Sequence, residues 1–169
     1  MLGINYRWSS IIFEERGAST LNERSLKINS YGDYDNVGAG DRAPDAPNLR
    51  NLESGQKTTL FDIINPARHI ILIFVTDTTY GLAKENIKIV DSLPSDSTKI
   101  VLITSKEPKA SDIDKTSPAF FDSKGYARTH FKVDPDAFTT VIIRPDGYIG
   151  GICKSAEGTK KYFSTIFDI

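Results

Sequence analysis

The side chains best suited to chemistry in this chain are one cysteine, two histidines and a run of threonines. Cys153 is the only cysteine, so the chain holds no internal disulfide, no paired-cysteine motif and no cysteine-rich zinc site. His69 and His130 are the only histidines, so a histidine-based metal site would need carboxylate ligands as well. Either histidine could act as an acid–base residue, because the ordinary pKa of histidine lies near neutrality. The sequence predicts no metal site and leaves acid–base chemistry open.

The threonines lie in residues 76–81, which read TDTTYG between an apolar run and an amphipathic stretch. If a helix begins here, its free backbone N–H groups can hold an anion. Asp77 or Thr78 could equally be the residue that caps that helix. We keep Asp77 and Tyr80, with the two histidines, as acid–base candidates. The ligand-binding candidates are Thr76, Thr78, Thr79, Phe138 and Thr139.

The elements around this loop form a strand–helix–strand unit. Residues 69–75 (HIILIFV) form a β-rich apolar run, which predicts a strand buried on both faces. Residues 81–93 place Ala83, Ile87 and Val90 on one stripe, which predicts a helix that ends before Pro94. Residues 99–104 predict a second buried strand. Two buried strands joined by a helix predict a parallel pair with a right-handed crossover.

The C-terminal third predicts a hairpin followed by a helix. Residues 138–143 and 148–152 are apolar and flank the turn sequence RPDG, which predicts an antiparallel pair. A last helix is predicted from about Ser155, which can cap it. Shorter helices are predicted at residues 60–64, capped by Thr59, and at residues 122–131. One short strand is predicted over residues 10–13.

This order of elements predicts an α/β, thioredoxin-like fold, with a mixed central sheet flanked by helices and a C-terminal hairpin and helix. In redox proteins of that fold, the nucleophilic cysteine follows the first core strand, where the helix dipole lowers its pKa. Residues 76–81 contain no cysteine, so the sequence predicts no thiol redox activity at that position. Cys153 is predicted to be a small, semi-buried residue at a strand end.

Composition excludes other classes of function. The 169 residues have a net charge of −1, which argues against a protein held to nucleic acid by electrostatics. The longest apolar run, residues 70–75, is too short to cross a membrane, and residues 1–10 lack a signal-peptide core. We therefore predict a cytoplasmic protein without nucleic acid or membrane partners. Residues 1–36 are predicted to be a lead-in segment, and residues 37–169 the thioredoxin-like domain.

Several motifs resemble one family. The sequences AGDRAPDAP at residues 39–47, LFD at residues 60–62 and RPDGYI at residues 144–149 occur in order, with the apolar strand between them. Together they resemble the C-terminal thioredoxin-like dimerisation domain of phenol hydroxylase-type, FAD-dependent aromatic monooxygenases. The lead-in sequence GINYRWSS at residues 3–10 resembles the segment that leaves the flavin domain in those enzymes. The chain would then be a free-standing relative of that domain or a fragment.

Asp41, Arg42 and Asp45 could be read as a charged catalytic cluster, but a structural network is the favoured interpretation. In that network Arg42 could hold the loop by a bidentate contact with a carboxylate such as Asp146. The residues assigned to this network are Asp41, Arg42, Pro44, Asp45, Arg144, Asp146 and Gly147.

Two functions follow from the resemblance. The first is a non-redox interaction or dimerisation domain tied to a flavin hydroxylase, acting as a homodimer or on a flavin monooxygenase partner. The aromatic lead-in would then dock on that partner or fold back on its own sheet. The second is a free-standing small enzyme or ligand-binding protein of specialised metabolism, which would bind an aromatic or polyketide-like molecule and use acid–base chemistry. No cofactor is expected in this chain, because its one Gly-x-Gly lies in a proline-rich loop with no helix after it.

Overall fold

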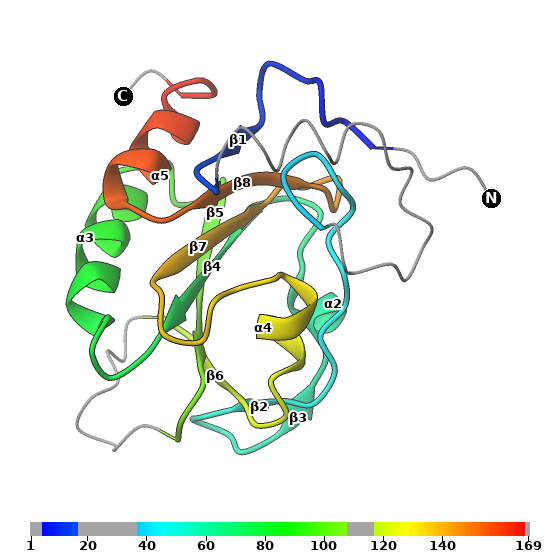
Figure 1. Cartoon of the computed structure of the whole chain (residues 1–169), viewed down its shortest axis with the longest axis vertical. Coiled ribbons are helices and arrows are strands. Elements are labelled where there is room, and N and C mark those ends of the chain that lie inside the picture. The colour runs from blue at the N-terminus through cyan, green and yellow to red at the C-terminus, as the bar shows by residue number, and fades with distance from the viewer. Residues whose placement is uncertain (1–4, 17–36, 108–116, 168–169) are drawn as a thin grey trace.

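The computed structural model describes residues 5–16, 37–107 and 117–167. Its strands form one mixed sheet in the order β1-β8-β7-β4-β5-β6-β2-β3 (Figure 1). The strands are β1 (Phe13–Glu14), β2 (Leu49–Asn51), β3 (Lys57–Thr58), β4 (His69–Val75), β5 (Thr98–Thr104), β6 (Ala119–Asp122), β7 (Thr139–Ile143) and β8 (Ile149–Cys153). The helices are α2 (Leu60–Ile63), α3 (Tyr80–Asp91), α4 (Tyr126–His130) and α5 (Ala156–Phe163).

Helices cover both faces of the sheet, and each face has its own apolar core. Helices α3 and α5 lie on one face and α2 and α4 on the other (Figure 1). Alternate residues of β4 divide between these cores, because successive side chains of a strand point to opposite faces. Ile71 and Ile73 pack with α3 and α5, and Leu72 and Phe74 pack with α4 and the loop before β2. The predicted thioredoxin-like arrangement is confirmed.

The pairing of β4 decides which loops share an end of the sheet. β4 is parallel to β5 and antiparallel to β7, with Phe74 opposite Thr139 and Ile70 opposite Ile143. The start of β7 therefore lies beside the end of β4, where α3 begins. The β7–β8 turn lies at the opposite end of the sheet.

The strongly patterned elements agree with the sequence, and the weakly patterned ones do not. The two buried strands, the hairpin and the caps Thr59 and Ser155 are confirmed. The predicted helix over residues 122–131 is wrong in its first half. Ala119–Asp122 is strand β6, parallel to β5, and the helix begins only after Gly125, which adopts a positive φ of 69°.

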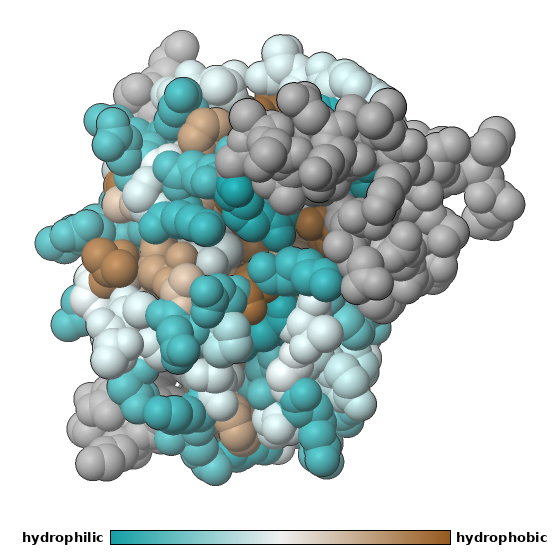
Figure 2. All heavy atoms as spheres, in the orientation of Figure 1, coloured by the Kyte–Doolittle hydropathy of each residue, from teal (hydrophilic) through white to brown (hydrophobic). Residues whose placement is uncertain are grey.

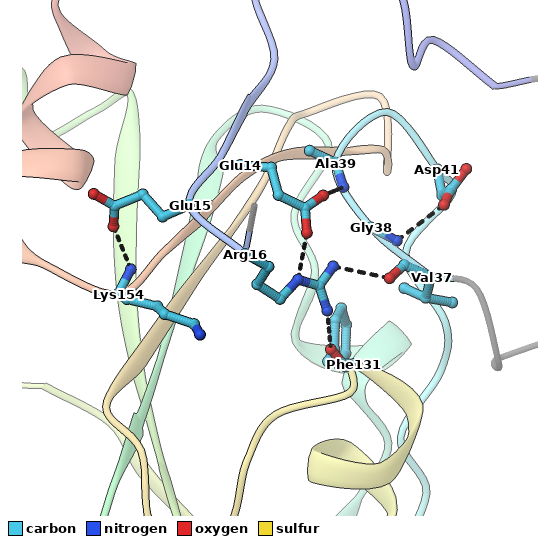
Figure 3. Close-up of polar contacts among 9 residues, drawn as sticks. All are labelled: Glu14, Glu15, Arg16, Val37, Gly38, Ala39, Asp41, Phe131 and Lys154. Atoms are coloured by element: carbon cyan, nitrogen blue, oxygen red, sulfur yellow. Dashed lines mark hydrogen bonds and ion pairs between the residues drawn. The ribbon is translucent and has the colours of Figure 1, made fainter. Parts of the chain in front are cut away.

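The N-terminal segment adds a strand to the sheet edge. The strand predicted over residues 10–13 is displaced, since β1 is Phe13–Glu14, parallel to β8 with Phe13 opposite Gly151. The Arg16 guanidinium contacts the Glu14 carboxylate and donates to the carbonyl oxygen of Val37 at 2.9 Å (Figure 3). The described part of the lead-in segment therefore folds back on the sheet of its own chain, and residues 17–36 lie outside the described residues.

Glu15 ties this segment to α5. Its carboxylate accepts a hydrogen bond from the backbone N–H of Lys154 (Figure 3). It also accepts hydrogen bonds from the backbone N–H and the hydroxyl of Ser155. A Cβ on Gly158 would lie 2.5 Å from the same carboxylate. Glu15 thus occupies the N-terminus of α5, where the helix dipole favours a negative charge.

On the face shown in Figure 2, hydrophilic residues cover most of the described surface and apolar residues form small, separate groups. Within residues 5–16, 37–107 and 117–167, no helix has the length and apolar character needed to cross a bilayer.

Candidate functional site

The loop between β4 and α3 gathers three threonine hydroxyls. The Thr76 N–H donates to Thr79 Oγ1 at 2.8 Å, and Thr76 Oγ1 lies 3.0 Å from the hydroxyls of both Thr78 and Thr79. Thr79 is buried, while Thr78 is exposed. A hydroxyl both donates and accepts, so this group can reorganise around a ligand atom.

The first turn of α3 is not capped by a side chain. Its N-cap is Thr79, not Asp77 or Thr78, and the Thr79 side chain makes no capping hydrogen bond. Within the described chain no acceptor is seen for the N–H of Gly81, and a Cβ there would meet nothing within 4 Å. An open, uncapped N-terminus of a 12-residue helix favours a negative charge.

Arg128 lies beneath this loop and was missed by the sequence analysis. Arg128 is only 6% exposed, and its Nη2 donates to the carbonyl oxygen of Val75, the last residue of β4, at 2.8 Å. Its Nη1 donates at 3.4 and 3.5 Å to the carbonyl oxygens of Asp134 and Pro135. The guanidinium carbon lies 5.5 Å from the ring centre of Phe74. The only sequence signal was its place between the inward-facing residues of α4.

The buried charge of Arg128 is only partly balanced. Burial lowers the pKa of Arg128, and the carboxylates of Asp122, Asp136 and Asp134 oppose that shift without overcoming it. No ion pair within 4 Å joins Arg128 to a carboxylate in the described residues, and its Nε has no hydrogen-bond partner there. An anion held nearby would therefore be stabilised by this cation as well as by α3.

Asp122 belongs to the same buried region. It is 3% exposed, and its Oδ2 accepts the backbone N–H of Arg128 at 3.1 Å. Its Oδ1 has no partner among the described residues. Asp122 therefore anchors the start of α4 and with it the backbone of Arg128.

The other ligand-binding candidates lie next to the loop. Thr139 pairs with Phe74, so Phe138 and Thr139 lie beside the end of β4. Both are buried, at 5% and 3% exposure, which makes them part of the wall behind the loop.

The acid–base candidates are spread over the molecule. His69 lies at the opposite end of β4, where its ring packs 5.9 Å from that of Phe163 and burial lowers its pKa. His130 lies on the other face of the sheet and donates through Nδ1 to the carbonyl oxygen of Asp45 at 2.7 Å. Of the four, only Asp77 and Tyr80 lie at the loop. Asp77 is exposed and 3.8 Å from Lys106 Nζ.

The loop motifs form a structural network with different partners from those expected. Asp146 pairs with Arg144 at 2.7 Å, not with Arg42, so the predicted Arg42–Asp146 contact is wrong. Asp41 forms a buried ion pair with Arg7, with distances of 2.6 and 3.1 Å. Arg42 instead stacks over the Tyr148 ring, because the Arg42–Tyr148 backbone bridge brings these side chains together.

The rest of the network links one loop to α2 and closes one turn. Asp45 Oδ1 accepts the N–H of Phe61 at 3.0 Å and so links its loop to α2, beside the buried Pro44. Gly147 has a φ of 82°, a conformation that few other residues adopt readily, and this closes the β7–β8 turn.

Cys153 is fully buried at the end of β8, more deeply than predicted. Burial raises the pKa of its thiol to about 12, although a hydrogen bond with Thr159 acts in the opposite direction. The thiolate needed for redox chemistry is therefore strongly disfavoured at Cys153.

Comparisons with known proteins show the fold but no family. No family model matches the chain, and no curated protein matches it. Among solved structures, the chain is similar to a thiol:disulfide interchange protein DsbE from Chlorobium tepidum, with 15% identity over 76% of this chain and 97% of that one and a TM-score of 0.62. It is also similar to the thioredoxin domain of a thiol-disulfide oxidoreductase from Bacteroides vulgatus, with 10% identity, the same coverage and a TM-score of 0.60. The bacterioferritin comigratory protein of Xanthomonas campestris, studied for alkyl peroxide reduction, matches with 15% identity over 69% and 90% of the two chains and a TM-score of 0.52.

These comparisons correct the predicted family and function. The similar structures are thiol-disulfide oxidoreductases and a peroxide-reducing protein, and no family model connects the chain to aromatic hydroxylases. The resemblance to the phenol hydroxylase C-terminal domain is therefore wrong. The functions drawn from it are wrong as well, both the non-redox dimerisation domain and the acid–base protein of aromatic metabolism. The short loop motifs misled because they specify turns, which unrelated chains of one fold can share.

Proposed function

We propose that the protein binds an external thiol as its thiolate at the N-terminus of α3 and activates that sulfur for thiol–disulfide exchange. The solved structures of the same fold include thiol-disulfide oxidoreductases, in keeping with chemistry on sulfur. In this chain the only cysteine is buried elsewhere, with a pKa raised to about 12. The reacting sulfur must therefore come from the ligand.

The observation that carries this proposal is the position of Arg128 under the uncapped start of α3. The helix N-terminus and a partly balanced buried guanidinium, linked through the carbonyl oxygen of Val75 at the end of β4, both favour a negative charge. Thr78 and Thr79 add hydroxyl donors in the loop just before α3. A thiolate is a monoanion that accepts such hydrogen bonds, and its formation is favoured wherever the pKa of the thiol is lowered.

The reaction needs two external reactants, a thiol and a disulfide, and no further oxidant or reductant. The ligand thiol loses its proton to solvent, and the bound thiolate attacks one sulfur of an external disulfide, which is the second reactant. A new sulfur–sulfur bond forms, the old one breaks, and the other sulfur leaves as a thiolate. The threonines and Arg128 hold the attacking sulfur in its charged form and do not change redox state.

We also propose that the protein works in the cytoplasm. With one cysteine in the whole sequence, the chain needs no oxidising compartment to form an internal disulfide. A low-molecular-weight thiol would be available to it there in reduced form.

The experiment uses glutathione as the probe thiol and an aromatic disulfide, 5,5′-dithiobis(2-nitrobenzoate), as the second reactant at pH 6.5. Protein should accelerate the exchange saturably. Each unit by which the glutathione pKa falls should raise the exchange rate about threefold. The fraction of glutathione present as thiolate rises more steeply than the nucleophilicity of its sulfur falls. The thiolate absorbance near 240 nm, followed against pH, should report the lowered pKa directly.

Thr79→Val removes one hydroxyl at nearly constant volume and should reduce the acceleration. Thr129→Val is the matched control, since Thr129 is an exposed threonine on α4. Loss of the effect in the first variant alone supports the proposal. An unchanged glutathione pKa in the presence of saturating wild-type protein would overturn it.

A further inference from the structure

A second surface lies at the other end of the sheet, on the N-terminal turn. The Ser9 N–H donates to the carbonyl oxygen of Tyr6 at 2.9 Å, which closes a turn over residues 6–9. The Tyr6 N–H donates to Gly40 at 2.7 Å, and the buried Arg7–Asp41 ion pair locks the turn to the domain. A Cβ on Gly40, whose φ is 87°, would lie 2.5 Å from the backbone nitrogen of Arg7. The turn is therefore built in tight contact with the domain.

This fixed turn exposes large aromatic side chains. Trp8, the only tryptophan of the chain, is 73% exposed, and Tyr6 is 44% exposed. Arg7, between them, points into the protein and is only 9% exposed. An aromatic side chain on a rigid backbone loses little conformational entropy when a partner covers it, which is why such residues often dominate binding interfaces.

The aromatic surface continues as two tyrosine rings in contact, each with a guanidinium group over it. Tyr6 and Tyr148 meet edge to face with ring centres 4.7 Å apart. The Arg42 guanidinium lies 5.9 Å from the Tyr148 ring centre, and the Arg144 guanidinium lies 5.8 Å from that of Tyr6. We call Tyr6, Trp8, Arg42, Arg144 and Tyr148 the arginine–tyrosine surface.

The charges on this surface specify the partner. Arg144 is already paired with Asp146. Arg42 is exposed, and the described residues place no carboxylate within 4 Å of it. The surface therefore offers one uncompensated guanidinium beside exposed aromatic rings. A guanidinium that is stacked on a ring is held in place to form a bidentate pair with a carboxylate.

We propose that the arginine–tyrosine surface binds a peptide segment that carries a carboxylate next to an aromatic side chain. The carboxylate pairs with Arg42, and the aromatic side chain packs on Trp8 and Tyr6. Among the described residues this surface has one uncompensated guanidinium, which is too little for a phosphate backbone, because such a backbone requires several basic contacts. The surface lies by the β7–β8 turn, at the opposite end of the sheet from the N-terminus of α3, so this inference does not depend on the proposed function.

The test is selection of random dodecapeptides displayed on phage against the immobilised full chain. The selected peptides should be enriched in an acidic residue adjacent to an aromatic one. A synthetic peptide of the selected sequence should then change the fluorescence of Trp8 saturably, because this is the only tryptophan. Arg42→Gln should weaken binding at least about tenfold, and Trp8→Ala, measured by calorimetry, should do the same.

Arg50→Gln is the matched control, since Arg50 also lies over a ring, that of Phe121 at 5.4 Å, but is paired with Glu107. It should leave binding unchanged. The inference is overturned if no acidic–aromatic peptide is enriched, or if Arg42→Gln and Arg50→Gln behave alike. It is also overturned if oligothymidylate binds the surface more tightly than the peptide, or if a second copy of the chain covers it in sedimentation experiments.

Discussion

The Nη2 atom of Arg128 donates a 2.8 Å hydrogen bond to the carbonyl oxygen of Val75, at the point where β4 ends and the threonine loop begins. This contact joins α4 on one face of the sheet to the start of α3 on the other. A residue that looked unremarkable in the sequence thereby becomes both a support of the loop and a source of positive charge beneath it.

Replacing Arg128 should therefore affect stability as well as thiolate binding. Arg128→Met keeps much of the apolar stem but leaves the carbonyl oxygens of Val75 and Asp134 without their donor. A loss of about 2–4 kcal/mol in the free energy of unfolding is expected, because buried acceptors lose hydrogen bonds from a charged group. Urea denaturation followed by circular dichroism measures this loss. A variant as stable as the wild type would show that the guanidinium does not support the loop.

The pKa of Cys153 predicts how stability depends on alkaline pH. Burial raises the thiol pKa to about 12 in the folded state, above the value of about 8.5 for an unfolded chain. The stability that comes from keeping the thiol neutral is fully present below about pH 8.5. It is then lost as the pH rises toward 12, with a slope of up to about 1.4 kcal/mol per pH unit. Cys153→Ala should have a flatter curve of unfolding free energy between pH 8.5 and 10.5.

Iodoacetamide provides a second readout for the same thiol. Native protein at pH 8 should be alkylated at Cys153 far more slowly than urea-unfolded protein, as followed by mass spectrometry. Equal rates in the two states would contradict both the burial and the raised pKa.

Tyr162 should tolerate the loss of its hydroxyl. The ring is fully buried, and its hydroxyl has no hydrogen-bond partner in the described part of the chain. Tyr162→Phe removes an unsatisfied polar group, so unfolding free energy should stay unchanged or rise by about 1 kcal/mol. Gly150→Ala is the opposite case, because its Cβ would lie 2.1 Å from that hydroxyl. Gly150→Ala should be clearly destabilising in thermal or urea denaturation, and less so in the Tyr162→Phe background. The same measurement applies to Tyr162→Phe.

The pair Glu15 and Gly158 is expected to be coupled. Glu15→Gln should cost about 1 kcal/mol, since the α5 N-terminus loses a charged acceptor. Gly158→Ala should destabilise the wild type, where the new Cβ would crowd the carboxylate at 2.5 Å. In a Glu15→Ala background the same change should instead stabilise by up to about 1 kcal/mol, because alanine favours helix. A double-mutant cycle by urea denaturation measures the coupling, and additive effects would exclude the contact.

Strong periodic patterns explain why much of the fold was predictable. The strands β4 and β5 are long apolar runs, α3 carries a clear apolar stripe, and RPDG marks the β7–β8 turn. These signals are local, and each agrees with the burial that the fold imposes. The strands β2, β3 and β6 have two to four residues each, and their stability comes from pairing across the sheet. No local pattern identifies such strands.

The sequence by itself determined the order of the main elements, the threonine loop at the start of α3 and the absence of a cysteine there. Only the tertiary structure decided the partners of the charged residues. Arg128 reaches Val75 across 53 positions, and Arg7 pairs with Asp41 across 34. The partner of a charged side chain depends on distance and burial in three dimensions, and the spacing along the chain encodes neither. For that reason the candidate site becomes visible only where Arg128 of α4 meets the end of β4, just before α3 begins.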